Sequence, residues 1–332
     1  MIGYRDQVNA AVAAVRISGP VGYVWLGRRS RPLPPPLLAQ MDRPECHRHL
    51  VACLREELYA SFYCAGGAVP ARWGEGQPAA ADPRLRHALS NANTGHGSWD
   101  RGWIVQHCAH DEAVVSTARM SVHVPLADCR ADDGRPIGPG VAVSVRLPKE
   151  LPALSAGFFM VVGDAAFGPT PDGGLVRVYW HIEQTGAPAL VHTLTSRLNA
   201  GHVPFRLKVA NHPARFDRCD AAVLYLRADR FQALRRMLRE VAGSLASRLH
   251  PRIPALTLRL APGVGLAESA GMGESFGMSR CRLLAQAIVD ADKLGINAPA
   301  ARLTAVIGHL AKNGVAIDAP YREPSVDGRH VL

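Results

Sequence analysis

The spacing of apolar residues predicts helices in the first third of the chain. Over residues 44–63 they recur at three- and four-residue intervals, which is typical of a helix with one buried face. Residues 6–15 show the same pattern over a shorter length. Between these stretches, residues 28–36 are rich in arginine and proline and predict an extended connector. Residues 66–98 lack a periodic pattern and contain several glycines, so we expect loops there.

From residue 103 onward, apolar and polar positions alternate, as they do in strands with one buried face. The alternation is clearest over residues 121–124 and 141–147. The second half combines both patterns. Strands are expected at 176–183, 203–209, 221–227 and 255–260, and helices at 185–199, 229–250, 279–293 and 298–312. The pattern therefore predicts an α+β protein with a mixed sheet flanked by helices and a helical and strand-rich N-terminal region.

A length of 332 residues corresponds to about two domains of ordinary size. The Pro/Gly-rich stretch at 164–174 is the best candidate for a boundary, although no sharp linker is visible. We expect an N-terminal helical plus β-rich region at 1–165 and an α+β region at 166–332.

Two expected strands collect polar side chains on one face. Alternation along Val176–Glu183 leaves one apolar face, and the other face consists of Arg177, Tyr179, His181 and Glu183. In the strand at 203–209, the polar face holds Arg206 and Lys208. If both strands lie in one sheet, the two polar rows face each other. Such a set suits the binding of an oxyanion and the transfer of a proton, whereas a solvated sheet face is the alternative.

The charge composition makes Lys208 informative. The chain has 38 basic residues against 28 acidic ones, and its net charge is +10. Its lysines are Lys149, Lys208, Lys293 and Lys312, and the other 34 basic residues are arginines. Lysine can lose its proton in a protein and arginine cannot, so a lysine in this chain is a candidate base. The positive charge predicts an anionic partner. The arginines are scattered rather than aligned with aromatic residues, so a nucleic acid is not indicated.

Two other segments are candidate phosphate sites. The glycine-rich stretch at 263–277 is an expected loop that leads into the helix at 279–293. Arg280 and Arg282 lie at the start of this helix, and the start of a helix attracts anions. The segment at 213–220 contains Arg215 and Arg218 together with two aspartates. These arginines are able to clamp a phosphate, and a local surface network of arginine and aspartate is the alternative.

The seven cysteines do not indicate a disulfide framework, because their number is odd and no CxxC pair occurs. Cys46, His47, His49 and Cys53 have spacings that a metal site would use, but the same stretch fits an amphipathic helix. We expect no metal. No signal peptide and no apolar run long enough to span a membrane is visible, so we expect a cytoplasmic protein without a membrane partner.

Several stretches together resemble the Hop-A type III effector family. The resemblance extends over about residues 45–295 and is strongest near residues 262–277. It rests on Tyr63-Cys64, Pro70–Trp73, Asn91–Trp99, Arg146–Glu150, Val203–Val209, Ala221–Leu226 and Pro262–Gly277. Stand-alone bacterial members of that family act as phosphopeptide lyases in the biosynthesis of class V lanthipeptides and thioamide-containing peptides.

The resemblance implies an enzyme, a lyase that eliminates phosphate from phosphoserine or phosphothreonine without a cofactor. Similarity to the more distant phosphothreonine lyases implies Lys208 as the base and His181 as the acid. Those lyases carry a lysine where Tyr179 stands here, so the stabilisation of the intermediate must differ. Candidates for binding phosphate are Arg206, Arg215, Arg218, Arg280, Arg282, Lys149 and Arg146.

The implied partners are a phosphorylated precursor peptide with its leader, which the N-terminal region is expected to bind, and kinase-like and cyclase-like proteins of the same pathway. Two alternatives stay open. One is a non-catalytic member that binds the peptide or serves as a scaffold for a kinase or cyclase. The other is an effector that acts on host phosphoproteins.

Overall fold

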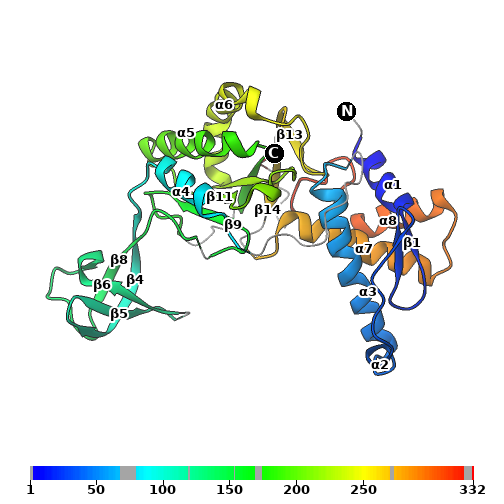
Figure 1. Ribbon diagram of the computed structural model, residues 1–332, viewed down its shortest axis with the longest axis horizontal. Helices are drawn as coiled ribbons and strands as arrows, with labels where there is room; N and C mark the ends of the chain where they lie inside the picture. Colours follow the sequence, from blue (N-terminus) through cyan, green and yellow to red (C-terminus); the bar gives the residue numbers. More distant parts are fainter. Residues whose placement is uncertain are drawn as a thin grey trace.

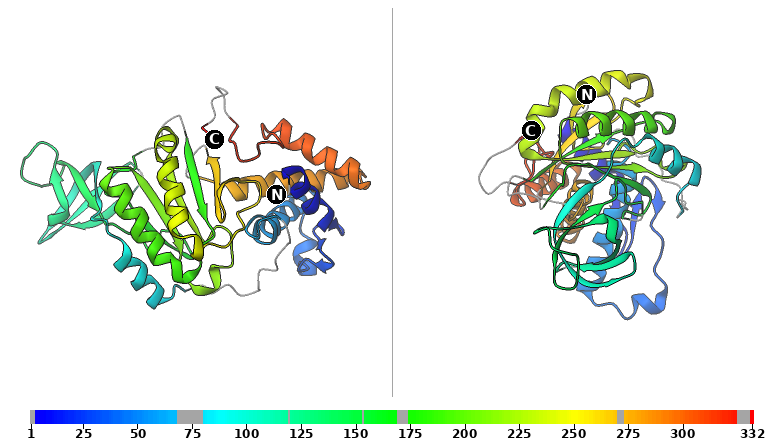
Figure 2. Two further views of the ribbon diagram at one scale, coloured as in Figure 1. Left: turned by 90° about the horizontal axis from the view of Figure 1, so that it is seen from above. Right: turned by 90° about the vertical axis from the view of Figure 1, so that its left-hand side faces the viewer.

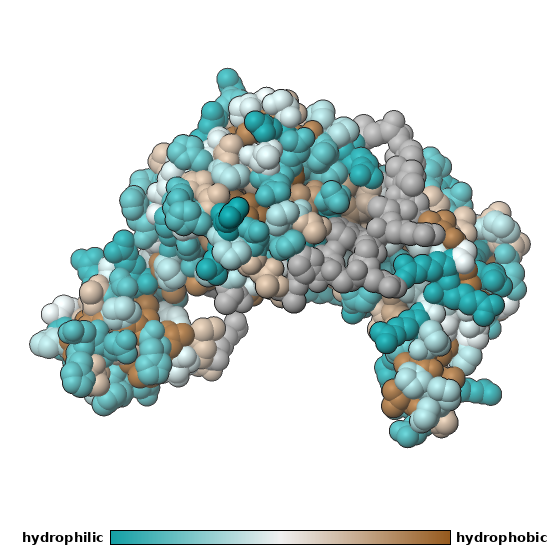
Figure 3. All heavy atoms as spheres, in the orientation of Figure 1, coloured by the Kyte–Doolittle hydropathy of each residue, from teal (hydrophilic) through white to brown (hydrophobic). Residues whose placement is uncertain are grey.

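The computed structural model describes residues 3–67, 80–118, 120–152, 154–168, 174–269, 273–324 and 331–332. Its elements form three lobes in a row (Figure 1): a small β lobe, a central lobe built on a sheet, and a helical lobe that includes the N-terminus. In Figure 3 the two outer lobes extend downward beyond the central one, so the outline of the molecule is concave along its lower edge.

The central lobe contains a six-stranded sheet with the strand order β13-β14-β10-β12-β11-β9. Every described pair of neighbours in this sheet is antiparallel, so the predicted α+β class is confirmed while the strand directions are not mixed. In sheet order, the strands are β13 (Leu258–Ala261), β14 (Val264–Ser269), β10 (Leu175–Trp180), β12 (Ala222–Arg227), β11 (Phe205–Ala210) and β9 (Phe158–Val162).

Helices cover one face of the central sheet, as the view from above shows (Figure 2). The apolar side chains of β10 and β11 that alternation assigned to the buried face, such as Val178 and Leu207, are fully buried in this layer. The polar residues between them must therefore point to the other face. The helices of this layer are α4 (Pro83–Ala92), α5 (Ala187–Ala200) and α6 (Ala228–Ser244).

The helical lobe packs against part of the opposite face of the sheet. Its core brings apolar residues of α3 and α7 together with Tyr179 and Tyr225 of the sheet. A capping box between Asp42 and Glu45 starts α3, and a single π-helical turn ends it. The elements are α1 (Tyr4–Ala14), α3 (Arg43–Leu58), the π-helical turn (Tyr59–Tyr63), α7 (Phe276–Lys293) and α8 (Pro299–Lys312).

An N-terminal three-stranded sheet and a short helix complete the helical lobe. The sheet has the order β1-β2-β3 and lies against α3. Its elements are β1 (Val15–Ile17), β2 (Tyr23–Trp25), β3 (Arg28–Arg29) and the following α2 (Pro35–Leu38). The proline-rich connector expected at 28–36 thus contains a short strand and one helical turn.

The small β lobe is inserted between α4 and β9. Its five strands form a separate sheet in the order β6-β5-β4-β8-β7, with a core of its own around Trp103 and Val143. The expected strands at 121–124 and 141–147 are confirmed as parts of β6 and β8. The strands are β4 (Ser98–Ala109), β5 (Glu112–Ser116), β6 (Ser121–Pro125), β7 (Cys129–Ala131) and β8 (Ala142–Leu147).

Two expectations of loops are wrong. The stretch at 66–98 contains α4, whose start is fixed by the Asp82 carboxylate accepting from the backbone N–H of Leu85. The glycine-rich stretch at 263–277 contains β14 next to the central strand β10. Gly265 belongs in this strand because a Cβ there would lie 2.7 Å from the Thr257 hydroxyl oxygen. Residues 270–272 of that stretch, and Pro70–Trp73, lie outside the described residues.

Elements of the two expected regions pack closely together. Strand β9 precedes the expected boundary at residue 165 and pairs with β11 beyond it. Helix α3 of the first region likewise packs on α7 of the second. The boundary stays a prediction. None of the helices in the described part of the chain has the length and apolar character to cross a membrane.

Candidate functional site

The polar face of β10, β12 and β11 forms the centre of the candidate site. Pairing aligns Tyr179 with Val223 and then Lys208, and it aligns Arg177 with Tyr225 and then Arg206. Because facing residues on paired strands share a face, both rows point to the same side of the sheet. The two polar rows thus lie in one sheet, but β12 separates them by two strand spacings, or ~10 Å.

Lys208 and Arg206 lie at the part of this face that the helical lobe leaves partly exposed. The Lys208 Nζ atom lies 4.3 Å from the centre of the Phe158 ring, and the Arg206 guanidinium lies 5.2 Å from that of Phe167. Burial lowers the pKa of Arg206, and the charge of Asp100 partly opposes this. Asp100 belongs to β4, so the small β lobe borders the site.

A buried ion pair lies beside Lys208. The Arg218 guanidinium donates two hydrogen bonds to the carboxylate of Asp220 and one of 2.9 Å to the Tyr59 hydroxyl. Burial alone would raise the pKa of Asp220, but Arg218 and then Lys208 outweigh it and hold this pKa at about 2. Arg218 also lies 5.4 Å from the Phe158 ring centre, so it shares this ring with Lys208. The region therefore combines several cations with the buried, ionised carboxylate of Asp220.

Aromatic side chains close the site toward the helical lobe. Tyr59 and Tyr63 of the π-helical turn stack with ring centres 5.4 Å apart, and Tyr63 meets Tyr179 edge-on at 6.2 Å. Gly277 of α7 allows this close packing, because a side chain there would overlap the Tyr63 ring. Burial raises the pKa of Tyr179, so its phenol stays protonated at neutral pH and is able to donate a hydrogen bond.

Arg177 occupies the row next to Tyr179. Its side chain is only 3% exposed and donates to the Ser269 hydroxyl and to the Glu274 carbonyl. The guanidinium also lies 5.4 Å from the centre of the Tyr225 ring. Arg177 therefore connects the polar face of the sheet to the segment that leads into α7.

His181 lies just beyond the end of β10 and two residues past the row of Lys208. Its side chain is 2% exposed, its Nδ1 atom lies 3.3 Å from the Arg252 carbonyl oxygen, and its ring centre lies 4.6 Å from that of His250. Burial, reinforced by His250, lowers the pKa of His181 to about 4. The imidazole is therefore neutral and enclosed at pH 7, and the structure does not bring it to the exposed cations.

This depressed pKa predicts an acid-sensitive stability. In the unfolded chain His181 regains its ordinary pKa of 6.5, so the unfolded state binds more protons between pH 6.5 and about 4. The free energy of unfolding should therefore decrease as the pH falls through this window, and His181 should account for about 3 kcal/mol of the decrease. A His181→Asn variant should lose about 3 kcal/mol less than the wild type between pH 7 and 4 in urea unfolding.

The exposed His192 on α5 provides a matched control, because a His192→Asn variant should follow the wild-type pH curve. Parallel curves for His181→Asn and the wild type would show that His181 titrates normally, and they would contradict its buried, neutral state.

The other arginine candidates differ in position. Arg215 is partly buried with its guanidinium packed over Gly157, and its pKa is lowered by burial and then by Arg218, which places it near the site. Arg280 is 1% exposed and donates to the carbonyls of Pro320 and Arg322, so it holds the C-terminal segment. Arg282 forms a half-exposed ion pair with Glu274 at 3.1 Å.

Lys149 and Arg146 lie where the small β lobe joins the central lobe. The Lys149 ammonium donates to the carbonyls of Ser90 and Asn93 at the end of α4. Arg146 is exposed and donates to the carbonyl of His96. Both side chains connect backbone segments at this junction.

The cysteine and histidine side chains of α3 that have the spacing of metal ligands do not form a cluster in the described part of the chain. The described part of the chain contains no group of three or more histidine, cysteine or acidic side chains able to hold a metal ion. Cys46 is buried in the amphipathic face of α3, and the His49 ring lies 3.4 Å from the Cys53 sulfur one turn away. This stretch therefore fits the alternative of an amphipathic helix.

The structure thus defines an α+β protein with a cation-rich, partly exposed sheet face. The chain matches the HopA1 effector protein family over residues 149–322, which is slightly more than half of its length. It therefore belongs to this family, and the matched stretch contains the strands that carry Tyr179, Arg206 and Lys208.

Two solved structures are similar to this chain. One is the effector protein from Pseudomonas syringae pv. tomato strain DC3000, with 16% identity, a TM-score of 0.45, and coverage of 86% of this chain and 93% of that one. The other is the effector protein from Pseudomonas syringae pv. syringae strain 61, with 24% identity, a TM-score of 0.38, and coverage of 49% and 62%. Among curated proteins, none matches.

Proposed function

We propose that this protein is a phosphoserine/phosphothreonine lyase, which removes phosphate from a phosphorylated peptide and leaves dehydroalanine or dehydrobutyrine. The observation that carries this proposal is the position of Lys208. It is a partly exposed lysine on a polar sheet face, beside Arg206 and sharing the Phe158 ring with Arg218. A base surrounded by cations suits the removal of a proton next to a carbonyl group and the departure of an anion.

In the proposed reaction, unprotonated Lys208 takes the α-proton of the phosphorylated residue. The electron pair of that C–H bond forms the Cα=Cβ double bond, the Cβ–O bond breaks, and phosphate leaves with its electrons. Nothing is oxidised or reduced, so the reaction needs no redox cofactor. Arg206 lies two residues from Lys208 on the same face of β11, and Arg215 lies close enough to Arg218 for the two charges to interact. Both are partly exposed and are the proposed phosphate ligands, with Arg218 adding charge behind them.

Tyr179 is the proposed hydrogen-bond donor to the developing enolate, since burial keeps its phenol protonated. His181 is as enclosed as Tyr179, but it is neutral and lies past the end of β10, two residues beyond the row of Lys208, so it fits the role of a proton donor less well than the sequence suggests. The proposal therefore depends on Lys208 and the arginines, and the acid role of His181 is a separate question that His181→Asn kinetics answers.

Family membership favours a second candidate, an effector that acts on phosphorylated proteins of a host. The chemistry at Lys208 would be the same and only the substrate would differ. A phosphorylated precursor peptide would be made by the kinase-like partner, and its dehydrated product would pass to the cyclase-like partner. Turnover of such a precursor peptide is the result that would distinguish the biosynthetic lyase from the effector.

The decisive experiment examines the product. Incubation with a phosphorylated peptide should release inorganic phosphate and lower the peptide mass by that of phosphoric acid, leaving an alkene that an added thiol captures. A phosphatase would release phosphate but leave a hydroxyl group, so no thiol adduct would form. Tight binding of the phosphopeptide without phosphate release, even with a kinase-like partner present, would contradict the lyase proposal and favour a binding protein.

A further inference from the structure

A pocket opens where the start of α1 meets the segment at 252–259, which leads into β13. Its volume is about 450 Å³, which lies within the range of small-molecule sites. Tyr4 and Gln7 of α1 line one side, and residues of the segment at 252–259 line the other. Lys208 and the arginines around it do not line this pocket, so it is separate from the candidate site.

Hydrogen bonds fix both walls of the pocket. The Tyr4 hydroxyl donates to the Thr257 carbonyl at 3.2 Å, and the Gln7 side-chain oxygen accepts from the backbone N–H of Leu256 at 2.9 Å. Leu256 has a φ of 63°, a left-handed conformation that costs free energy in a residue other than glycine. The contacts around Leu256 hold it in this conformation. The pocket is therefore preformed, which lowers the entropic cost of binding a ligand.

Two arginines bring their charges to this pocket. The Arg259 guanidinium donates to the Pro251 carbonyl at 2.8 Å, and the Arg252 guanidinium donates to the Ala65 carbonyl at 3.2 Å. Burial raises the pKa of Cys219 to about 12, and the charges of both arginines oppose this rise, so both guanidinium groups lie near one thiol. A guanidinium has several N–H donors, so a single bond to a carbonyl leaves others for a ligand.

The described residues that line the pocket include no carboxylate. Neither arginine forms an ion pair with an acidic side chain of the described chain. The charge of Asp220 also acts on Cys219, but this carboxylate is bound by Arg218. Asp6, in the first turn of α1, is exposed and does not line the pocket. The pocket therefore presents two positive charges to a ligand.

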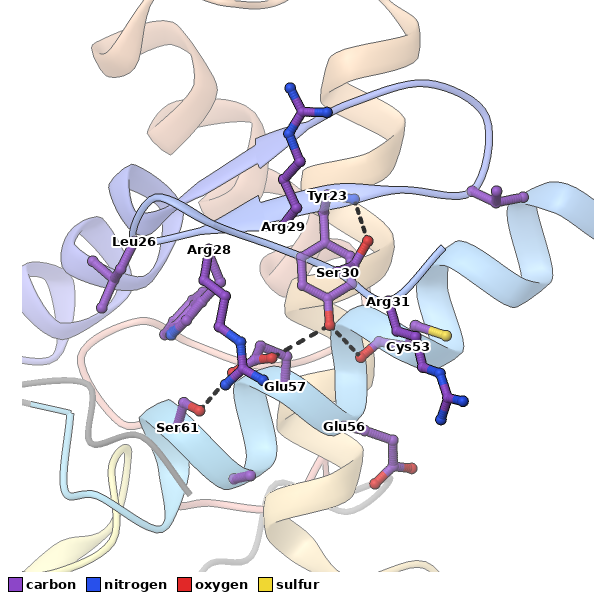
Figure 4. A pocket seen from close by; sticks show the side chains of 13 residues that line it. Tyr23, Leu26, Arg28, Arg29, Ser30, Arg31, Cys53, Glu56, Glu57 and Ser61 are labelled. Atoms are coloured by element: carbon purple, nitrogen blue, oxygen red, sulfur yellow. Dashed lines mark hydrogen bonds between the residues drawn. The ribbon is translucent and has the colours of Figure 1, made fainter. Parts of the chain in front are cut away.

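The pocket between the hairpin of β2 and β3 and helix α3 differs in this respect. Figure 4 shows arginine side chains of the hairpin together with Glu56 and Glu57 of the helix. The Glu57 carboxylate accepts hydrogen bonds from the hydroxyls of Tyr23 and Ser61, which leave its negative charge in place. Charges of both signs line that pocket, so it shows no preference for an anion.

The rest of the lining of the two-arginine pocket is largely apolar. Ile253, Pro254 and Leu258 line it together with Tyr4, and the side chains of Ile253 and Leu258 are partly exposed. Gly66 allows this wall to approach closely, because a Cβ there would lie 2.8 Å from the Ile253 carbonyl oxygen. A ligand that fills the pocket would therefore combine an anionic group with an apolar body.

We propose that this pocket binds a small organic phosphate monoester. Such a group carries a charge of about −1.5 to −2 at neutral pH, which matches two arginines better than the single charge of a carboxylate does. Arg252 and Arg259 would bind the phosphate. Ile253, Leu258 and the Tyr4 ring would contact the apolar body. The proposal does not depend on the lyase function, since none of these residues belongs to the candidate site.

Protection of a single arginine from chemical modification tests this site. Phenylglyoxal modifies accessible arginines, and mass spectrometry of peptides measures the reaction at each arginine separately. Phenyl phosphate, at ten times its Kd, should slow the modification of the exposed Arg252 in the full-length protein by roughly tenfold. Arg16, which is exposed on β1, should react at an unchanged rate.

Two further probes test the chemistry of the ligand. Phenyl sulfate has the same ring but a single charge, and inorganic phosphate has the charge but no ring. Each should require a roughly tenfold higher concentration than phenyl phosphate for the same protection of Arg252, because one of the two contacts is missing. Equal protection by either probe would overturn the proposal of an organic phosphate monoester. So would equal protection of Arg16, or no protection of Arg252.

A variant tests the second arginine. Arg259→Gln should raise the concentration of phenyl phosphate that protects Arg252 by roughly tenfold, since one charge-assisted contact is lost. Arg16→Gln is the matched control and should leave this concentration unchanged. Unchanged protection in Arg259→Gln would contradict the joint role of the two arginines. The comparison of probes uses the wild-type protein, so it stands even if Arg259→Gln fails to fold.

A phosphoserine peptide distinguishes this pocket from the candidate site. Added to the Lys208→Ala variant, so that it is not consumed, the peptide should protect Arg206 and not Arg252. Protection of Arg252 by the peptide as strong as that by phenyl phosphate would assign the pocket to the peptide and contradict a small-molecule ligand. If the lyase function fails, protection of Arg252 by phenyl phosphate still decides whether this pocket binds a phosphate monoester.

Discussion

A Lys208→Arg variant should lose phosphate elimination almost completely, with kcat reduced by roughly 10⁴-fold, the upper end of what a positioned base contributes. Arginine keeps the positive charge and is able to stack on the Phe158 ring that Lys208 contacts. It cannot give up its proton at neutral pH, so only the function as a base is removed. Release of inorganic phosphate from a phosphorylated peptide measures the loss.

Two comparisons make this result specific. Lys312→Arg changes an exposed lysine on α8 in the same way and should leave turnover unchanged. Lys208→Ala should be as inactive as Lys208→Arg and also lose the contact with Phe158. Full activity in Lys208→Arg would contradict the assignment of Lys208 as the base and would leave it as one more phosphate-binding cation.

The faces of the strands could be predicted because period-two alternation depends only on the local chain. Val178 and Leu207 are fully buried on one face, while Tyr179 and Lys208 point to the other, as the sequence indicates. The order of strands in a sheet depends on long-range pairing, which no local pattern contains. The insertion of β12 between β10 and β11 therefore escaped prediction, and with it the place of Tyr225 between Arg177 and Arg206.

The degree of burial of the polar side chains could not be predicted from the sequence either. His181 continues the polar alternation of β10, but it lies past the end of the strand, beneath the segment that carries His250 and Arg252. The Arg218–Asp220 pair has the same spacing as the exposed pair of Arg227 and Asp229, and the surface network that the sequence left open for it is wrong. Burial of one pair follows from its packing against Tyr59 and Phe158, which distant parts of the chain supply.

The difference in burial between the Arg218–Asp220 and Arg227–Asp229 pairs predicts a large difference in their contributions to stability. Asp220→Asn should lower the free energy of unfolding by about 3–5 kcal/mol, since it leaves the Arg218 charge buried without a counter-charge. The Asp220 side chain is 2% exposed and accepts from both Arg218 and Tyr59. Asparagine keeps the size but removes the charge. Urea unfolding of the full-length protein at pH 7, followed by circular dichroism, measures the change.

Asp229→Asn is the matched control, because it removes the carboxylate of an arginine–aspartate pair with the same spacing whose aspartate side chain is 50% exposed. It should cost no more than about 1 kcal/mol. If the large cost of Asp220→Asn comes from the uncompensated charge, the double variant Arg218→Met/Asp220→Asn should regain part of the lost stability, since no buried charge remains. Equal losses of stability for Asp220→Asn and Asp229→Asn would contradict this explanation, and so would a double variant without recovery. Either result would show that the Arg218–Asp220 ion pair does not stabilise the packing of Tyr59 and the π-helical turn against the sheet.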